Sequence, residues 1–210
     1  MKGDSKTLFC PGIPGAGKTI MASIVVDYLQ SRFQSDKYSD HKTGIAYVYC
    51  IYDKHKRQEQ SKLTLLSTLL RQLIEQLPKI PKLVKDLYEK KKFSHPTFAE
   101  VSELLKTTAR SEYSQVFIVL DALDEGEGDA HAVISEIRDL QSQFKTRLMA
   151  TSRPIPEISQ RFKDDINLEI SAMGEDIERY LDVRLPSFVR EKRELLHLAK
   201  RSIVKAVSGV

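Results

Sequence analysis

A glycine-rich turn between two apolar runs restricts the architecture of this chain more than its other features do. The stretch LFCPGIPGAGKTIMASIVV spans residues 8–26 and ends its turn in Lys18 and Thr19. Its centre, GIPGAGKT, has the pattern G-x-x-x-x-G-K-[ST]. Glycines in that pattern let successive backbone N–H groups converge on phosphate oxygens, where a Cβ would obstruct them. The sequence therefore predicts a strand, a phosphate-binding loop and a helix in direct succession.

The loop predicts a role for each residue at its end. Lys18 would reach the β and γ phosphates of a nucleotide, and Thr19 would place its hydroxyl on Mg²⁺. The helix that begins there would direct its positive end at the anion. An ordinary glycine-rich turn is the alternative, which the flanking strand and helix patterns disfavour. The residues expected to contact nucleotide are Gly12, Ile13, Pro14, Gly15, Ala16, Gly17, Lys18, Thr19 and Ile20.

Apolar periodicity alternates between strand-like and helix-like segments, which is typical of an α/β domain with a mostly parallel sheet. The expected strands are Thr7 to Pro11, Gly44 to Tyr52, Gln115 to Asp121, Thr146 to Ser152 and Ile166 to Ile170. The expected helices are Thr19 to Phe33, Leu63 to Leu77, a helix opened by a Thr97–Glu100 capping box and running to about Arg110, and Ala130 to Phe144. The first helix is expected to be amphipathic, with Ile20, Ile24, Tyr28 and Phe33 at helical spacing. From Glu175 onward the pattern is helical only, so the α/β core should stop near Ser171.

A second motif supplies acidic residues next to the loop. The segment VFIVLDALDE, residues 116–125, is an apolar strand that ends in Asp121. Ligands bind at the carboxyl ends of strands in open α/β sheets, so Asp121 would hold Mg²⁺ through its water shell. Glu125 is the expected catalytic base that polarises the attacking water, with Asp124 close behind. A solvated acidic loop is the alternative, which the nearby phosphate loop disfavours.

A third motif ends in an arginine. The segment RLMATSRP, residues 147–154, is another strand pattern followed by Arg153. An arginine at the carboxyl edge of the sheet can contact the γ-phosphate and report whether it is present. The alternative is a surface arginine in a salt bridge.

Composition limits the class of protein. The chain has 210 residues, of which 41% are hydrophobic and 30% charged, enough for one substantial core. Its apolar runs are shorter than the roughly 18 to 20 residues that span a bilayer, so we expect a soluble, cytoplasmic protein without membrane partners. Cys10 and Cys50 both lie in apolar segments, which favours buried reduced thiols over a disulfide or a zinc site.

The motifs LFCPGIPGAGKT, VFIVLDALDE and MATSRP together resemble the NACHT branch of the STAND-type P-loop NTPases, most closely the nephrocystin-like NACHT modules. The small residue and the second acidic pair in DALDE make the resemblance specific. It implies a three-layer P-loop NTPase sandwich with a mostly parallel five-stranded sheet in the order 2-3-4-1-5. The strand ending in Arg153 would lie between the phosphate-loop strand and the Asp121 strand. The resemblance also implies a NACHT core over residues 1–171 and a truncated start of a helical lid over 172–210.

The resemblance implies a nucleotide-dependent switch. Such a module would bind Mg²⁺ with ATP or GTP, hydrolyse the nucleotide slowly, and control assembly of a larger multidomain protein through protein partners. A structural nucleotide-binding oligomerisation module with negligible turnover is the second hypothesis.

Two further hypotheses are less favoured. A nucleic-acid motor or clamp could use the basic stretch KIPKLVKDLYEKKK, residues 79–92. The acidic residues within that stretch favour a solvated helix face, so nucleic acid is not an expected partner. A small-molecule kinase would need an acceptor-binding lid between strands, whereas residues 63–77 have the pattern of core packing.

Overall fold

Strands and helices alternate along the described part of the chain. The computed structural model describes residues 6–33, 42–50, 61–92, 94–125 and 127–171, together with positions 181, 184, 194–198 and 201–202. The elements run in the order β1 (Thr7–Pro11), α1 (Lys18–Phe33), β2 (Thr43–Tyr49), α2 (Lys62–Glu75), α3 (Lys82–Lys90), α4 (Phe98–Glu112), β3 (Gln115–Asp121), η3 (Leu123–Glu125), α5 (Glu127–Gln143), β4 (Thr146–Ser152), α6 (Pro156–Ser159), η4 (Gln160–Phe162) and β5 (Ile166–Asn167).

The strands form one five-stranded sheet in the order β2-β3-β4-β1-β5, as predicted. All neighbouring strands are parallel. β4 pairs with β1 on one side, where Thr7 lies opposite Leu148, and with β3 on the other, where Val116 lies opposite Thr146. The strand that leads to Arg153 therefore separates the phosphate-loop strand from the Asp121 strand, and the carboxyl ends of all three meet at one edge.

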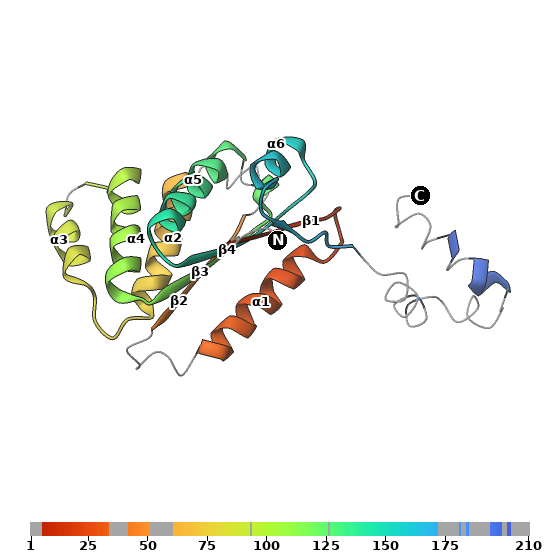
Figure 1. Ribbon diagram of the computed structural model, residues 1–210, viewed down its shortest axis with the longest axis horizontal. Coiled ribbons are helices and arrows are strands. Elements are labelled where there is room, and N and C mark those ends of the chain that lie inside the picture. The colour runs from red at the N-terminus through yellow and green to blue at the C-terminus, as the bar shows by residue number, and fades with distance from the viewer. Residues whose placement is uncertain are drawn as a thin grey trace.

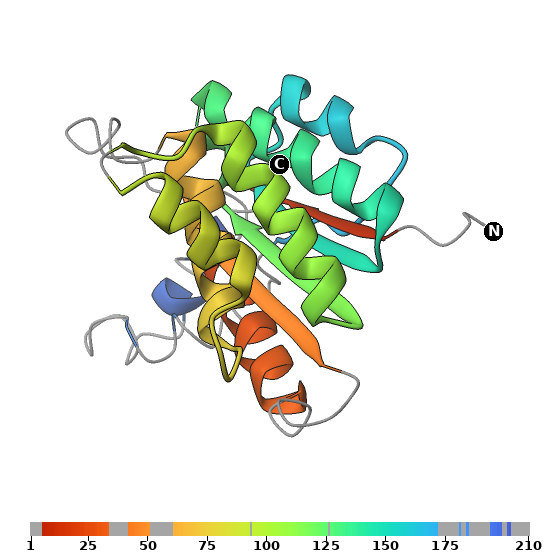
Figure 2. The same ribbon diagram turned by 90° about the vertical axis from the view of Figure 1, so that its left-hand side faces the viewer.

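Helices cover both faces of the sheet and give three layers. α1 crosses one face, whereas α2, α4 and α5 lie over the other (Figure 1). The turned view in Figure 2 shows α2, α4 and α5 beside one another above the strands, with α1 below them. The larger buried cluster includes Leu66, Leu69, Leu73, Leu105 and Ile137, and the smaller one consists of Cys10, Ala22, Val26, Val119 and Met149. The predicted α/β three-layer fold is confirmed.

The face of α1 that turns toward the sheet differs from the expected one. The helix spans nearly the predicted residues, but its buried side chains are Ala22, Val26 and Leu29. The isoleucines at 20 and 24 are 67% and 56% exposed, so the apolar spacing correctly indicated a helix and wrongly indicated its buried side. Of the residues expected on the apolar face, Phe33 does reach the sheet, where its ring stacks on Phe117 of β3.

Element boundaries differ from the prediction at two strands. β2 ends at Tyr49, whereas the predicted strand ran to Tyr52, and positions 51 and 52 lie outside the described residues. β5 has only two residues, but backbone hydrogen bonds from Leu168 to Phe9 (2.9 Å) and from Ile170 to Pro11 (2.7 Å) carry the pairing onward.

Three other expectations concern local features. The predicted capping box at the start of α4 is present, with Thr97 and Glu100 bonded reciprocally. Cys10 and Cys50 are buried free thiols. Within the described ranges, the structure contains no helix of the length and apolarity that a membrane crossing requires. Most of the predicted lid, residues 172–210, lies outside the described residues, although positions 194–198 are helical.

Candidate functional site

Glycines shape the turn between β1 and α1. Gly15 and Gly17 have φ angles of 79° and 93°, in the left-handed region that favours glycine. Gly12 is required for a different reason, because a Cβ there would lie 2.4 Å from the carbonyl oxygen of Ile170. The Gly12 N–H donates to the Ser152 carbonyl (3.1 Å), which ties the loop to the end of β4. Gly15 and Gly17 are therefore needed for their backbone torsions, and Gly12 is needed because no Cβ fits there.

Lys18 lies against the loop that precedes it. Its ammonium Nζ donates to the carbonyl oxygens of Gly12 (2.8 Å) and Ile13 (2.9 Å). α1 begins at Lys18, so the N–H groups of its first turn, which have no partner within the helix, face the same loop. The loop thus combines a cation with a helix N-terminus, and both favour an anion.

Thr19 and Asp121, which come from α1 and β3, meet at the end of the sheet. The Thr19 hydroxyl donates to Oδ2 of Asp121 at 2.7 Å, and Asp121 is 2% exposed. The other oxygen, Oδ1, accepts from the Thr151 hydroxyl at 2.5 Å. A hydroxyl and a carboxylate are hard oxygen donors of the kind Mg²⁺ prefers, so the pair fits that ion.

Thr151 was not singled out from the sequence. It is fully buried in β4 and bridges two strands, because its hydroxyl also accepts from the backbone N–H of Ala122 at 3.0 Å. The signal that could have identified it is its place near the end of the apolar strand pattern that leads to Arg153. Its neighbour across the sheet is the strand that ends in Asp121.

A left-handed residue turns the chain after β3. Ala122 has a φ of 57°, the one positive value at a non-glycine residue among the described positions. Left-handed backbone costs an L-residue about 1 to 2 kcal/mol, and alanine has the smallest side chain that must tolerate it. The turn leads directly into η3, which carries Asp124 and Glu125. The small residue in DALDE is therefore the residue that occupies this turn.

Asp124 is bonded to Arg153. One carboxylate oxygen accepts from the Arg153 backbone N–H (2.8 Å) and the other from its guanidinium Nε (2.5 Å). The Asp124 side chain is 3% exposed and that of Arg153 is 47% exposed. Burial by itself would raise the pKa of Asp124, but these hydrogen bonds outweigh it and hold the pKa below its usual value. Both oxygens of Asp124 are thus engaged in positioning the arginine.

The buried thiol of Cys50 lies at the same end of the sheet as the acidic residues. Burial raises the pKa of the Cys50 thiol to about 12, and the charges of Asp121, Glu125 and Asp124 add to that effect. Cys50 directly follows β2, and its N–H donates to the Asp121 carbonyl at 3.0 Å. The pKa of this thiol is therefore raised by burial first and by three acidic side chains second.

The three sequence motifs line one cavity. It has a volume of about 730 Å³ and opens between the loop, the turn after β3 and the end of β4. Asp121 lies behind Thr19, to which it is bonded, and does not line the cavity. The lining residues are Pro14, Gly15, Gly17, Lys18, Thr19, Ile20, Ala122, Asp124, Glu125 and Arg153.

This sheet order, with the loop after β1 and the aspartate at the carboxyl end of β3, defines the P-loop class of α/β folds. The chain belongs to the family described as "Nephrocystin 3, N-terminal", whose model matches residues 1–153. The nephrocystin-like resemblance of the three motifs is thereby confirmed. None of the curated proteins matches the chain.

Solved structures share the fold at low sequence identity. The Aeropyrum pernix ORC1 protein in complex with DNA is 16% identical, with a TM-score of 0.56 over 85% of this chain and 43% of that one. The Aeropyrum pernix ORC2 protein in ADPNP–ADP complexes is 14% identical, with a TM-score of 0.54 over 86% and 46%. The CDC6P protein of Pyrobaculum aerophilum is 16% identical, with a TM-score of 0.53 over 83% and 41%. The chain thus spans less than half the length of these proteins.

The comparisons do not support the expectation that nucleic acid is an unlikely partner. The ORC1 structure contains DNA, and so does the structure of Drosophila ORC, which is 13% identical with a TM-score of 0.50. At these identities the likeness extends to the fold alone, and the DNA belongs to those proteins.

Proposed function

We propose that the chain is a nucleotide-dependent switch that binds Mg²⁺ with ATP or GTP and hydrolyses the nucleotide slowly. The observation that carries the proposal is that the phosphate loop, Thr19 and the Asp124–Arg153 pair line one cavity of about 730 Å³, while Asp121 is bonded to Thr19 at its wall. Those three features are what a triphosphate requires: a cradle, a metal site and a group that contacts the terminal phosphate.

The loop and its lysine would hold the phosphates. Backbone N–H groups in the loop and at the start of α1, such as those of Gly15, Gly17 and Thr19, would surround the phosphate oxygens. Lys18 would exchange its two loop carbonyls for phosphate oxygens. Thr19 and Asp121 would hold Mg²⁺, which when bound neutralises charge on the phosphates. Thr151 would keep the Asp121 carboxylate oriented toward Thr19.

The two acidic residues after Ala122 receive different roles. Asp124 uses both oxygens on Arg153, so we assign it to positioning that arginine beside the terminal phosphate. Glu125 lines the same cavity and is the proposed base that accepts a proton from the attacking water. The Asp124–Arg153 pair would then be the element that responds when the γ-phosphate is present or lost.

A phosphate-release time course tests these roles. Glu125→Gln should leave nucleotide binding intact and reduce release by about 10²- to 10⁴-fold, the usual contribution of a general base. Asp124→Asn should reduce release by about tenfold, because the arginine loses its anchor while the base remains. A larger loss with Asp124→Asn than with Glu125→Gln would reverse the assignment and make Asp124 the base.

A structural nucleotide-binding oligomerisation module is the second candidate. Both carboxylate oxygens of Asp124 accept hydrogen bonds from Arg153, so of the two acidic residues only Glu125 is proposed to act as a base. This favours a module that turns nucleotide over slowly or not at all. In that case bound nucleotide would persist, and Glu125→Gln would not change phosphate release.

The wider context of the switch is also part of the proposal. We assign residues 1–171 to the nucleotide-binding core and 172–210 to the start of a helical lid that packs differently in the two nucleotide states. The module would act in the cytoplasm by controlling assembly of a larger protein. A parallel measurement with duplex DNA at low and physiological salt distinguishes this role from a nucleic-acid clamp, for which affinity would persist at the higher salt.

A further inference from the structure

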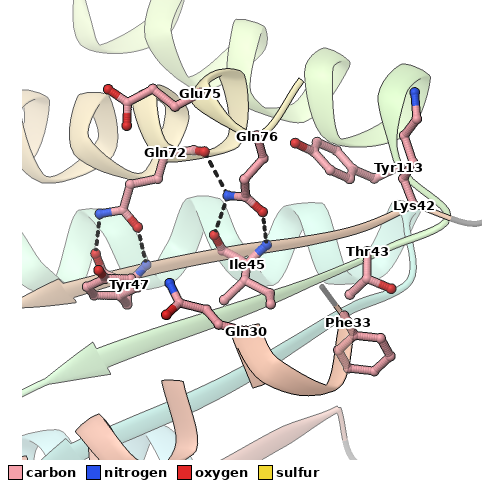
Figure 3. Close-up of a pocket in the computed structure, with 10 residues that line it drawn as sticks. All are labelled: Gln30, Phe33, Lys42, Thr43, Ile45, Tyr47, Gln72, Glu75, Gln76 and Tyr113. Carbon is pink, nitrogen blue, oxygen red and sulfur yellow. Dashed lines mark hydrogen bonds between the residues drawn. The ribbon is translucent and has the colours of Figure 1, made fainter. Parts of the chain in front are cut away.

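The outer edge of β2 is covered by side chains. β2 lies at one end of the sheet, and its inner edge pairs with β3. An edge strand normally presents a row of unpaired N–H and C=O groups, which is a template for another strand. Here the N–H and C=O groups of Ile45 and Tyr47 point away from β3 and meet two glutamines (Figure 3). Gln72 lies in α2, and Gln76 is the residue that caps the C-terminal end of this helix.

Each glutamine amide bonds both the N–H and the C=O of one β2 residue, as the opposite residue of an antiparallel strand would. Gln72 Oε1 accepts from the Tyr47 N–H (2.9 Å), and its Nε2 donates to the Tyr47 carbonyl (2.9 Å). Gln76 Oε1 accepts from the Ile45 N–H (3.1 Å), and its Nε2 donates to the Ile45 carbonyl (2.7 Å). Four hydrogen bonds that a neighbouring strand would supply are thus made within the chain.

The spacing of a helix makes this pairing possible. Outward-facing groups on a strand recur every second residue, about 6.6 Å apart at 3.3 Å per residue. Residues four apart on one face of a helix are separated by about 6 Å at 1.5 Å per residue. Gln72 and Gln76 are four apart, and their partners Tyr47 and Ile45 are two apart in the opposite direction. α2 therefore runs antiparallel to β2 with its two amides in register with the edge.

β2 would be prone to pair with other copies of itself if its edge were uncovered. Its sequence TGIAYVY has seven residues with neither charge nor proline and is rich in β-branched and aromatic residues. Such segments pair readily with copies of themselves. A cavity of about 310 Å³ borders the same edge, lined in part by Phe33 and Tyr113, and would accommodate side chains of an added strand.

We propose that Gln72 and Gln76 form a surrogate strand that closes the edge of β2 against pairing with β2 of a second copy. Copies of the chain then assemble through some surface other than a continued sheet at this edge. The proposal is independent of nucleotide binding, and it limits the surfaces available to the assembly in the proposed function.

Residue-resolved hydrogen exchange of the unaltered chain is the first test. The amides of Ile45 and Tyr47 should exchange slowly although they lie at a sheet edge, because each donates to a glutamine. Gln76→Leu should raise the exchange rate at Ile45 and leave Tyr47 protected, and Gln72→Leu should do the reverse, each by at least about tenfold, equivalent to about 1.4 kcal/mol. Fast exchange at both amides of the unaltered chain would overturn the proposal.

Oligomeric state is the second test. The double variant Gln72→Leu/Gln76→Leu should shift to higher mass in light scattering and bind a synthetic peptide of residues 43–49 flanked by lysines. Gln30→Leu is the matched control, because Gln30 is exposed and lines the same cavity but makes none of the four hydrogen bonds to β2. The substitution introduces the same apolar side chain without uncovering the edge. Either of two results would overturn the proposal. One is an equal mass shift in the control, and the other is a double variant that shows no mass shift and does not bind the peptide. If the double variant does not fold, the single variants and their exchange rates decide.

Discussion

Replacement of Thr151 by valine removes one hydroxyl that serves two groups at once. The side chain is fully buried, donates to Oδ1 of Asp121 and accepts from the backbone N–H of Ala122. Valine has nearly the same shape, so packing around the site is preserved while both hydrogen bonds are lost. The effect of Thr151→Val therefore measures the polar contacts rather than a cavity.

The magnitude follows from the two groups left behind. A buried donor without a partner costs about 1 to 3 kcal/mol, which applies to the Ala122 N–H. A hydrogen bond to a charged group contributes about 1.5 to 3 kcal/mol, which applies to Asp121. The added methyl group recovers about 0.8 kcal/mol of transfer free energy. We expect the free energy of unfolding to fall by about 2 to 5 kcal/mol.

Urea unfolding followed by circular dichroism measures this loss. With a slope of about 2 kcal/mol per molar urea, the midpoint should fall by about 1 to 2.5 M. Thr151→Ser is the matched control, because it keeps the hydroxyl and loses only a methyl group, for about 1 kcal/mol. A valine variant as stable as the serine variant would refute the role assigned to the hydroxyl.

Two further predictions concern the loop and a helix cap. Gly12→Ala should lower the urea midpoint by the equivalent of about 1 to 3 kcal/mol, because its Cβ would collide with the Ile170 carbonyl; an unchanged midpoint would contradict this. The Thr97 backbone N–H, and after it Lys91, hold the pKa of Glu100 at about 2. Because the folded pKa lies below the unfolded value, this stabilisation is present above about pH 4.5 and is lost as the pH falls toward 2. Glu100→Gln should therefore flatten the acid limb of stability measured by urea unfolding at several pH values, and parallel curves would exclude the effect.

The parts of the fold that depend on neighbours in sequence were predictable. Glycine torsions, the capping box and the periodicity of strands and helices are local, so the loop at Gly15 and Gly17 and the start of α4 lie where expected. The order of the strands is not local, and it was inferred from the family resemblance of the three motifs. The convergence of Thr19 and Asp121 followed once that order was adopted.

The remaining features depend on contacts between distant elements. Which side of α1 is buried is decided by how closely it approaches the sheet, and spacing alone favoured Ile20 and Ile24 over Ala22. Thr151 becomes important only because β4 lies beside β3. The anchor that Asp124 provides for Arg153 likewise requires the turn at η3 to face β4. Such pairings have no signature in a single segment of sequence.

The central claim is that the loop of residues 12–19 binds a nucleotide with Mg²⁺. Titration with fluorescent ATP and GTP analogues, with and without Mg²⁺, tests it most directly when the unaltered chain is compared with Lys18→Ala. We expect magnesium-dependent binding by the unaltered chain, an affinity difference that identifies the base, and loss of binding in the variant. Equal binding by Lys18→Ala would contradict the claim, because the nucleotide would then be held without the loop's lysine.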